Sequence, residues 1–423
     1  MLGHSQLSKR VLVVGAGIIG LCAALYCLRR GFAVTLVDRD SRSRRSCSFG
    51  NAGMIVPSHF VPLAAPGAVR LGLRWMFDPT APFHIRARWS LDLFAWLARF
   101  ARSATRAHVE RAAPLLRDLC LASRQCYEEL AAEPDAHFGL VRTGLLMLCR
   151  TAHGLREEME TAAFARRLGL PAEPHVGRDA RALDPTLRED IAGAVHYPLD
   201  CHLSPDRLMT FLAAAVERAG GSFVWNTDIV GWRSDGMQVR AAQDRDGREL
   251  EADEFVLCAG AWSPESVRDL GLAIPIQGGK GYTLTLPRHS PAPAHCAILT
   301  EDRVAVTPMD DGVRVGGTME LAGLTRTIDD ARVRAVVDSV PRYYASMQTD
   351  DFAGIVPWSG LRPCSPDGLP YVGRTNRRAN LVIATGHAMM GVTLAPITGK
   401  IVAMLLAGEP APLDLTLLAP DRF

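Results

Sequence analysis

The sequence has little net charge and no long apolar run. Its 47 Lys and Arg residues exceed its 45 Asp and Glu residues by too few to form the concentrated basic surface of a nucleic-acid binder. No uncharged apolar stretch reaches the ~18 residues that a membrane-spanning helix requires. The first ten residues, MLGHSQLSKR, also lack the apolar segment of a signal peptide. We therefore expect a cytoplasmic protein with no nucleic-acid partner.

Paired cysteines and cysteine–histidine clusters are also missing. The ten cysteines are scattered along the chain, with no CxxC pair and no zinc-binding spacing to a histidine. A chain of 423 residues can bury a large core without crosslinks, so these cysteines indicate free thiols in a reducing compartment. The sequence therefore predicts neither a disulfide framework nor a metal site.

A βαβ unit is predicted between residues 10 and 38. Arg10–Val14 is typical of a buried strand and leads into a glycine-rich turn. A helical stretch, Leu21–Arg30, and a second strand, Phe32–Val37, follow. Asp38 comes directly after that strand, where a carboxylate can bind ribose hydroxyls. The order of these elements predicts a dinucleotide site.

The turn itself is Gly15-Ala16-Gly17-Ile18-Ile19-Gly20, a GxGxxG pattern. In such a turn the first glycine permits the tight bend, and the second lets a pyrophosphate approach the backbone. The third glycine lets the helix pack on the strand, and the helix N-terminus faces the phosphates. The motif alone leaves FAD and NAD open.

The distribution of strand patterns indicates two interleaved domains. Strands of the buried parallel type occur near both ends of the chain and between residues 200 and 260, whereas residues 274–320 alternate as antiparallel strands do. We expect an α/β fold with a Rossmann-like FAD-binding domain assembled from residues 1–60, 200–265 and 355–423. Residues 61–199 and 266–354 are expected to form an α+β substrate domain on an antiparallel sheet.

Several local elements are also expected. Residues 41–68, rich in Ser, Gly, Asn and Pro, predict an irregular loop, and residues 89–106 and 114–133 predict two helices. Ser204 is expected to cap a helix that begins at Pro205. The stretch Gly391–Leu406 is expected to be helical at its later end.

Further segments stand in order along the whole chain and carry a resemblance. They are Ser46–Met54 (SCSFGNAGM), Ala64–Gly67 (AAPG), Lys280–Leu284 (KGYTL), Gly360–Pro363 (GLRP) with Ser365–Gly368, and Gly386-His387 with Gly391–Pro396 and Gly399. Together they resemble the D-amino-acid oxidase (DAO) family of flavoproteins. The similarity is closest to its bacterial D-amino-acid dehydrogenases, including the D-hydroxyproline dehydrogenases. The resemblance implies FAD, with its isoalloxazine ring between two domains.

The resemblance also implies a set of cofactor contacts. Ser46, Ser48, Asn51, Ala52, Gly53 and Met54 would line the flavin, unless they form only a surface loop. Ile229 would lie near the adenine and Ala259-Gly260 near the phosphates, with a core position as the alternative for each. The remaining implied contacts are Arg39, Trp262, Gly386, Gly391, Val392, Thr393 and Leu394.

Arg362 is the strongest catalytic candidate. A guanidinium matches a substrate carboxylate through two parallel hydrogen bonds. In the family that this chain resembles, the matching arginine anchors the carboxylate and so places the substrate Cα–H over flavin N5. A surface salt bridge is the alternative. His387 is expected to hydrogen-bond the flavin or the substrate, with a satisfied core histidine as the alternative.

The sequence departs from the family at two places. Some amine-oxidising relatives carry a tyrosine as a second carboxylate anchor, and the comparable stretch Arg303–Pro308 has none. The candidates for that role are Arg303, Thr307, Tyr282 and Tyr344. Glycine oxidases carry an arginine where this chain has Met389-Met390. An apolar wall at that position suits a side chain or a pyrrolidine ring.

Residues 69–106 combine arginines with aromatic residues, including Phe77, Trp89, Phe94, Trp96 and Phe100. Basic amphipathic helices can lie on an anionic membrane surface, where a quinone acceptor would be at hand. The alternative is a solvated helix face with aromatic residues in the core. A peripheral contact with the inner face of the membrane is therefore one expectation for this region.

These features predict an FAD-dependent dehydrogenase of D-amino acids, with D-proline or a hydroxy-D-proline as cyclic alternatives. Hydride transfer to the flavin would oxidise the amine to an imine, and electrons would pass to a quinone or another acceptor. An oxygen-using D-amino-acid, glycine or sarcosine-type amine oxidase is the alternative enzyme. A non-catalytic flavin-binding subunit of a larger complex is the alternative of another class.

Overall fold

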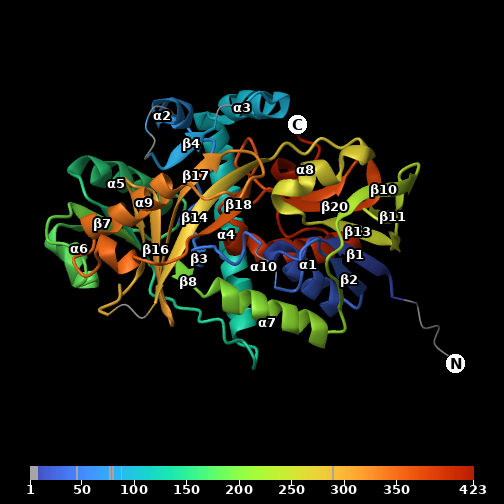
Figure 1. Cartoon of the computed structure of the whole chain (residues 1–423), viewed down its shortest axis with the longest axis horizontal. Coiled ribbons are helices and arrows are strands. Elements are labelled where there is room, and N and C mark those ends of the chain that lie inside the picture. Colours follow the sequence, from blue (N-terminus) through green and yellow to red (C-terminus); the bar gives the residue numbers. More distant parts are fainter. Residues whose placement is uncertain (1–7, 44–45, 76–77, 79–80, 87, 288–289) are drawn as a thin grey trace.

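Two β-sheets of different construction organise the chain (Figure 1). The computed structural model describes residues 8–43, 46–75, 78, 81–86, 88–287 and 290–423. Residues 1–7 of the N-terminal segment MLGHSQLSKR lie outside the described residues, as does Phe77. The two sheets lie on opposite sides of the long helix α4 (Arg106–Ala131), which runs through the middle of the view in Figure 1.

The first sheet contains six strands in the order β19-β20-β13-β1-β2-β9. Strands β20, β13, β1, β2 and β9 are parallel, and β19 pairs antiparallel with β20 at one edge. The bounds are β1 Arg10–Val14, β2 Ala33–Val37, β9 Ser222–Val224, β13 Glu254–Leu257, β19 Tyr371–Thr375 and β20 Arg378–Thr385. This sheet therefore draws its strands from three separate parts of the chain, as expected for a Rossmann-like fold.

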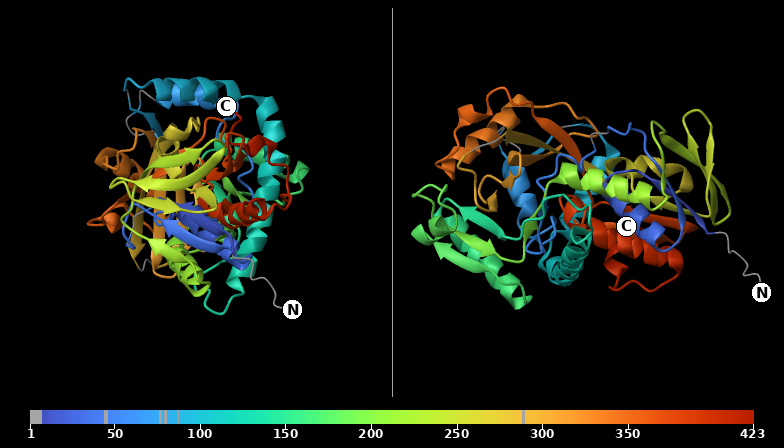
Figure 2. Two further views of the ribbon diagram at one scale, coloured as in Figure 1. Left: turned by 90° about the vertical axis from the view of Figure 1, so that its right-hand side faces the viewer. Right: turned by 90° about the horizontal axis from the view of Figure 1, so that it is seen from below.

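Alternation along β1 directs its side chains into two apolar cores. Val11 and Val13 pack with the helices on one face, whereas Leu12 and Val14 pack beneath a three-stranded sheet on the other. The helices are α1 (Ile18–Arg29), α7 (Pro205–Arg218) and α10 (Gly391–Ala407), and the small sheet is β10 (Ile229–Asp235), β11 (Gln238–Asp244) and β12 (Glu249–Glu251). Both faces of the parallel sheet are thus covered (Figure 2).

The second sheet has the order β18-β14-β17-β16-β15-β5-β7-β6, and β4 also pairs with β17. Most of its pairs are antiparallel, and the pairs β15–β5 and β17–β4 are parallel. Its strands are β4 Phe83–Ile85, β5 Leu145–Cys149, β6 Glu173–Val176, β7 Gly193–Tyr197, β14 Gln277–Pro287, β15 Cys296–Leu299, β16 Val304–Met309, β17 Gly312–Leu321 and β18 Trp358–Cys364. Helices α5 (Ala152–Arg167) and α9 (Asp330–Ser339) pack on it. Strand β18 belongs to this sheet although the division from sequence placed residues 355–423 in the FAD-binding domain.

Shorter elements complete the chain. They are the strand pair β3 (Met54–Ile55) and β8 (Cys201–His202) and the helices α2 (Ala68–Trp75), α3 (Leu91–Ser103), α6 (Arg178–Leu183) and α8 (Ser263–Ser266). Among the described residues, short 3₁₀ turns occur at Gly260–Trp262, Arg268–Leu270, Val340–Arg342, Thr349–Phe352 and Thr416–Leu418.

Several predicted boundaries were wrong. The region predicted as one irregular loop contains β3, which pairs with β8. The expected helix at 114–133 begins earlier, at Arg106, because the Thr105 hydroxyl accepts a hydrogen bond from the His108 N–H and caps it. Ser204 precedes α7 but makes no side-chain cap, and α10 is helical from Gly391 rather than only at its end.

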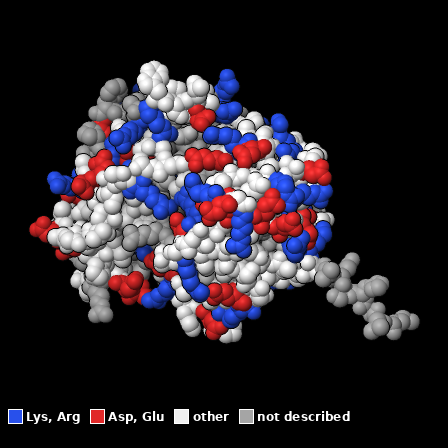
Figure 3. Space-filling view, turned by 45° about the vertical axis from the view of Figure 1, so that its right-hand side comes forward, with Lys and Arg blue, Asp and Glu red and all other residues white. Residues whose placement is uncertain are grey.

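None of the helices in the described ranges is both long and apolar enough to cross a bilayer. Lys and Arg side chains are interspersed with Asp and Glu side chains on the face that Figure 3 shows, with no continuous surface of one sign there.

A buried ion pair joins two central strands of the second sheet. Lys280 on β14 lies 2.9 Å from Glu320 on β17, and the exposed fractions are only 2% and 5%. The Tyr282 hydroxyl also donates to Glu320, and the Lys280 ammonium donates to the Thr327 carbonyl. Removing one partner would leave the other charge buried and uncompensated, which is far more costly than losing a surface pair.

We predict that Glu320→Gln, which preserves an acceptor for Tyr282, lowers the free energy of unfolding by about 3–5 kcal/mol. The double variant Lys280→Met/Glu320→Gln should recover most of this loss, because no unpaired charge remains. The exposed pair Arg106–Glu110 provides the control, and Glu110→Gln should cost less than ~1 kcal/mol. Denaturant titrations measure all three. Equal costs for Glu320→Gln and Glu110→Gln would show that the buried pair is not a structural requirement.

Candidate functional site

A cavity of about 1370 Å³ lies between the two sheets. At one end it begins at the carboxyl ends of β1 and β2, with Gly15 and Asp38 on its wall. At the other it reaches β14, β17 and β18, with Thr283, Thr318 and Arg362 on its wall. Ligands of parallel α/β sheets bind outside the carboxyl ends of the strands, so the cavity lies where a dinucleotide would bind.

The glycine-rich turn has the close contacts that its pattern predicts. A Cβ atom at Gly15, whose φ is +102°, would lie 2.5 Å from the Cys258 carbonyl oxygen. A Cβ atom at Gly20 would lie 1.8 Å from the Gly15 carbonyl oxygen, so α1 can pack on the turn only with glycine there. At Gly17 the nearest other atom is the Ser48 hydroxyl at 3.7 Å, and the residue borders the cavity. Only this middle glycine leaves room for a ligand.

The N-terminus of α1 points its backbone donors at the cavity. Gly17 precedes the helix without a side-chain cap, and the Ile18 N–H donates to the Ser48 hydroxyl at 3.1 Å. The Asp38 carboxylate accepts from the Ala16 N–H at 2.7 Å and from the Asp40 N–H at 2.9 Å. Asp38 therefore fixes the shape of the turn from the cavity wall, and its contact with a ribose stays a prediction.

The loop Ser46–Met54 is held against the second sheet. The Arg314 guanidinium donates to the carbonyl oxygens of Phe49 and Asn51 at 3.0 Å each. The Thr283 hydroxyl donates to the Gly50 carbonyl at 2.8 Å. A Cβ atom at Gly53, whose φ is +76°, would lie 2.1 Å from the Leu203 carbonyl oxygen. The loop that was predicted to line the flavin is therefore an ordered wall of the cavity.

Two arginines flank Trp262 on the first-sheet side of the cavity. The Arg39 guanidinium lies 3.6 Å from the centroid of the Trp262 ring, and that of Arg326 lies 5.2 Å from it. The pKa of Arg39 is lowered, chiefly by burial and also by the Arg326 charge. Neighbouring aspartates, of which Asp40 has the largest effect, partly oppose this shift. The Arg39 and Arg326 guanidinium groups suit the anionic portion of a dinucleotide, and Asp38, Asp40 and Asp228 also line the cavity.

His387 is a buried group with one free ring nitrogen. Its Nε2 lies 3.0 Å from the Thr398 hydroxyl, whereas its Nδ1 is buried without a partner among the described residues. Burial lowers the pKa of His387 to about 3, so the ring is neutral at physiological pH. The residue borders the cavity, where a ligand can satisfy Nδ1.

The structure brings most of the predicted site residues together. Those on the cavity wall are Gly15, Gly17, Ile18, Ile19, Asp38, Arg39, Ser46, Ser48, Asn51, Ala52, Met54, Ile229, Ala259, Gly260, Trp262, Arg362, His387, Gly391, Val392 and Thr393. The other five, Ala16, Gly20, Gly53, Gly386 and Leu394, are not on this wall. A Cβ atom at Gly386 would lie 2.8 Å from the Tyr371 ring, so glycine there permits close packing. The individual contacts with FAD stay predictions.

Arg362 presents a cation to the cavity. Its side chain lies against the backbone of Gly281 on the neighbouring strand, where a Cβ atom would be 2.3 Å from the guanidinium. One guanidinium nitrogen donates to the Thr318 carbonyl at 2.5 Å. Within the described part of the chain, no Asp or Glu forms an ion pair with it. The alternative role for Arg362, a surface salt bridge, is therefore not seen among the described residues. The remaining N–H donors of its guanidinium suit a carboxylate.

The four candidates for a second carboxylate anchor differ in whether they border the cavity. Arg303 borders the cavity. Thr307 and Tyr344 are fully buried away from it, and the Tyr282 hydroxyl is committed to Glu320. Met389 and Met390 both line the cavity and form the expected apolar wall.

Sequence reasoning missed a polar pair on the cavity wall. The Tyr197 hydroxyl on β7 donates to the Glu158 carboxylate on α5 at 2.8 Å. Burial raises the pKa of Glu158 to about 7, while the hydrogen bond from Tyr197 and the Arg303 charge act in the opposite direction. No local signal marks either residue, because the pair is 39 positions apart in the chain.

Trp358 was also missed. Cβ atoms at Gly50 and at Gly360 would each lie 2.0 Å from its indole, so the ring fits only because both residues are glycines. It thereby joins the loop Ser46–Met54 to the strand that carries Arg362.

Comparisons with known proteins agree with this architecture. The family model described as "FAD dependent oxidoreductase" (DAO) matches residues 10–405. A D-amino acid dehydrogenase from Paramagnetospirillum magneticum is 33% identical over 420 residues, which cover 98% of this chain and 99% of the relative. A D-amino acid dehydrogenase from Bradyrhizobium diazoefficiens is 31% identical over 423 residues, with 98% and 99% coverage.

Solved structures share the fold. A glycine oxidase from Geobacillus kaustophilus has a TM-score of 0.78 at 22% identity, covering 98% of this chain and 100% of that chain. An L-proline dehydrogenase from P. horikoshii has a TM-score of 0.74 at 18% identity, with 98% coverage of both chains. The predicted α/β fold with a Rossmann-like FAD-binding part is confirmed.

The residues present fit FAD. The turn at Gly17 is open, Gly17 supplies no side-chain cap to α1, and the buried Nδ1 of His387 and hydroxyl of Ser46 have no partner in the residues described. All four features face or border one cavity. Such orphaned polar groups are satisfied when a polar ligand is bound.

We predict that Gly17→Ala folds but weakens FAD binding by at least about tenfold, or ~1.4 kcal/mol, because the added methyl group projects into the cavity. Gly20→Ala should instead destabilise the fold, since its methyl group would collide with the Gly15 carbonyl. The ratio of flavin to protein absorbance and the thermal melting curve distinguish the two effects. Full flavin content in Gly17→Ala would mean that the cofactor lies elsewhere in the cavity.

Proposed function

Because this chain belongs to the DAO family of FAD-dependent oxidoreductases, we propose that it dehydrogenates D-amino acids. Two relatives at 33% and 31% identity carry that name, which supports the substrate class. The observation on which the proposal rests is the Arg362 guanidinium, which faces the cavity without an acidic partner among the described residues. A cation in this position needs an anionic ligand, and an amino-acid carboxylate supplies one.

FAD, when bound, accepts the hydrogen and the electron pair of the substrate Cα–H bond. Arg362 binds the carboxylate and fixes the substrate in a single orientation. Loss of a hydride from Cα requires the amine in its neutral form, and the Arg303 cation on the cavity wall disfavours an ammonium group there. The nitrogen loses a proton as the C=N bond forms, and water then hydrolyses the imine to a 2-oxo acid and ammonia.

The apolar wall of Met389 and Met390 favours substrates that have a side chain over glycine. It also suits the ring of D-proline or a hydroxy-D-proline, whose oxidation gives a cyclic imine. We propose that neutral His387 hydrogen-bonds the flavin or the substrate through Nδ1, which is buried without a partner among the described residues.

The electron acceptor that we propose is a quinone or another small carrier rather than oxygen. Exposed apolar side chains that border the cavity support this choice. Trp89 is 97% exposed and Leu73 is 58% exposed, and both line the cavity, as does Phe94. A larger rate with a soluble quinone than with oxygen favours the dehydrogenase, and the reverse favours the oxidase.

We predict that Arg362→Lys lowers kcat/KM for D-amino acids by roughly 30- to 1,000-fold, because a bidentate charged contact of ~2–4 kcal/mol is lost. The ammonium of lysine retains the charge but lacks the planar fork of two donors. FAD should stay bound, because the glycine-rich turn that would hold its phosphates lies at the other end of the cavity. An amino-acid amide, which lacks the carboxylate, should be a poor substrate for both proteins and lose little in the variant. Wild-type kcat/KM in Arg362→Ala would place the anchor elsewhere, with Arg303 as the next candidate.

We also propose a peripheral membrane contact through α2 and α3, which lie together at the top of Figure 1. Leu73, Trp89 and Leu91 are exposed there beside the exposed cations Arg70 and Arg74. Trp96, by contrast, is buried and donates to the Cys364 carbonyl, so it belongs to the core. Exposed apolar and basic groups together suit an anionic lipid surface.

Trp89→Ser/Leu91→Ser is expected to reduce sedimentation with anionic vesicles at low salt severalfold. Val356→Ser is the matched control, since Val356 is 84% exposed and lies outside this region. Raising the salt concentration should release the wild-type protein, because the electrostatic part of the attraction is screened. Vesicle binding that changes neither with salt concentration nor with the double substitution would contradict the proposed contact.

A further inference from the structure

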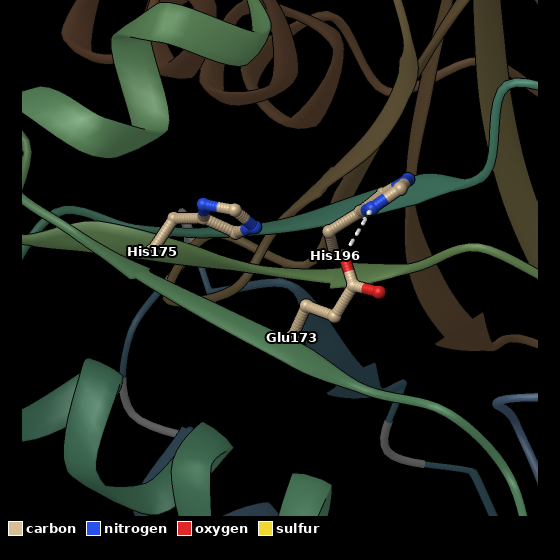
Figure 4. Close-up of side chains that lie close together, drawn as sticks. All are labelled: Glu173, His175 and His196. Carbon is tan, nitrogen blue, oxygen red and sulfur yellow. Dashed lines mark hydrogen bonds and ion pairs between the residues drawn. The ribbon is translucent and has the colours of Figure 1, made fainter.

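The strands β6 and β7, at one end of the second sheet, carry a carboxylate and two imidazoles on one face (Figure 4). Glu173 and His175 are two residues apart on β6 and so point to the same side. His196 on β7 is directly opposite Glu173 in the antiparallel register. One ligand atom from each of the three side chains lies within 4.8 Å of the other two. The sequence predicts no metal site, because the group forms only when the two strands pair.

The hydrogen bonds of His196 define which ring nitrogen is free. Its Nε2 lies 3.0 Å from the Thr143 carbonyl oxygen, which can only accept, so Nε2 carries the proton. In the neutral ring Nδ1 then bears a lone pair, and it faces the Glu173 carboxylate at 3.4 Å. The 3.4 Å separation is longer than the 2.7–2.9 Å typical of a charged hydrogen bond, so the contact is a weak one even when the ring is protonated and donates to Glu173. A cation between the neutral ring's Nδ1 and the carboxylate would satisfy both.

The backbone beside His196 is shaped to hold the ring. A Cβ atom at Gly144, whose φ is +83°, would lie 2.2 Å from His196 Nε2, so the ring fits against the chain only at a glycine. A histidine that ligates a metal commonly donates its second ring N–H to a backbone carbonyl, as His196 does to Thr143. This contact fixes both the tautomer and the direction of Nδ1.

His175 supplies a further unsatisfied nitrogen. Its Nε2 is buried and has no hydrogen-bond partner among the described residues, and its ring lies 6.4 Å from that of His196. A third imidazole, His295, lies on another side of His196 with 5.7 Å between the ring centroids. An unpaired buried nitrogen next to a facing pair of acceptors is the arrangement that a metal ion resolves.

We propose that Glu173, His175 and His196 bind a divalent transition-metal ion of the Zn²⁺ class. Two imidazoles and a carboxylate are a ligand set that zinc adopts, with a solvent molecule in the fourth position. Glu173 is 57% exposed on its side chain, which gives the ion a path from solvent. Bonds of ~2.0–2.1 Å require the three ligand atoms to move closer together, through small rotations of the Glu173 and His175 side chains toward His196.

The site lies outside the flavin cavity, because none of its three ligands borders that cavity. Its neighbour in the chain, Tyr197, does border the cavity and points to the opposite face of β7. The ion would therefore join β6 to β7 without touching the substrate. We expect it to stabilise this end of the sheet, and not to take part in oxidation.

The test uses untagged holoprotein treated with a chelator and then titrated with Zn²⁺ by calorimetry. Wild type should bind one equivalent and melt at a higher temperature when Zn²⁺ is present. Glu173→Gln and His175→Ala should each weaken binding by at least tenfold and abolish the rise in melting temperature. Both residues are outside the apolar cores, so the variants should fold and retain FAD.

His153→Ala is the matched control. His153 and Glu157 also place an imidazole nitrogen 3.4 Å from a carboxylate, but on an exposed helix face without a second histidine. The Zn²⁺ affinity of His153→Ala should equal that of wild type. The proposal is overturned if wild type binds no stoichiometric Zn²⁺, or if Glu173→Gln and His175→Ala bind it as tightly as His153→Ala.

Discussion

Close backbone contact around α1 is the constraint on which the cofactor end of the molecule depends. On one side, Gly20 brings the helix against the Gly15 carbonyl, where a Cβ atom would lie 1.8 Å away. On the other, Gly399 of α10 lies against the backbone of Cys22, where a Cβ atom would be 2.5 Å from the carbonyl carbon. Both contacts place the first turn of α1 beside the cavity. The donors of that turn are thereby directed at the position of a dinucleotide phosphate.

The two sheets are joined through the walls of one cavity. Arg314 and Thr283 of the second sheet donate hydrogen bonds to the loop Ser46–Met54, which follows strand β2 of the first sheet. The same β14 that carries Thr283 also provides Gly281, against which the Arg362 guanidinium lies. The loop Ser46–Met54 and the Arg362 side chain therefore both contact β14. Contact with one shared strand suits a reaction that depends on the relative orientation of cofactor and substrate.

Local patterns predicted the parts of this protein that depend on neighbouring residues. The unit from Arg10 to Asp38 was predicted because its strands, turn and helix lie within one short stretch. Arg362 was singled out by a resemblance at the GLRP segment, and the structure places it on the cavity wall. The start of α4 was predicted less accurately. The helix was expected to begin at Pro114, but the Thr105 side chain caps it and it begins at Arg106.

Contacts between distant segments could not be predicted in the same way. The Glu158–Tyr197 pair joins a helix to a strand, and neither residue belongs to a motif. Among four candidates for a second anchor, strand alternation and burial left only Arg303 beside the cavity. The group of Glu173 and His196 likewise depends on the register of two strands. Such features need the sheet order, which the sequence pattern alone does not specify.

We propose that FAD and a chiral amino acid meet in this cavity in one orientation. Anaerobic mixing of the holoprotein with each enantiomer of one apolar amino acid tests this orientation, with flavin absorbance as the signal. The D-enantiomer should bleach the flavin within the time of turnover, and the L-enantiomer should leave it yellow. A flavin that stays yellow with a full panel of D-amino acids, D-proline included, would contradict it.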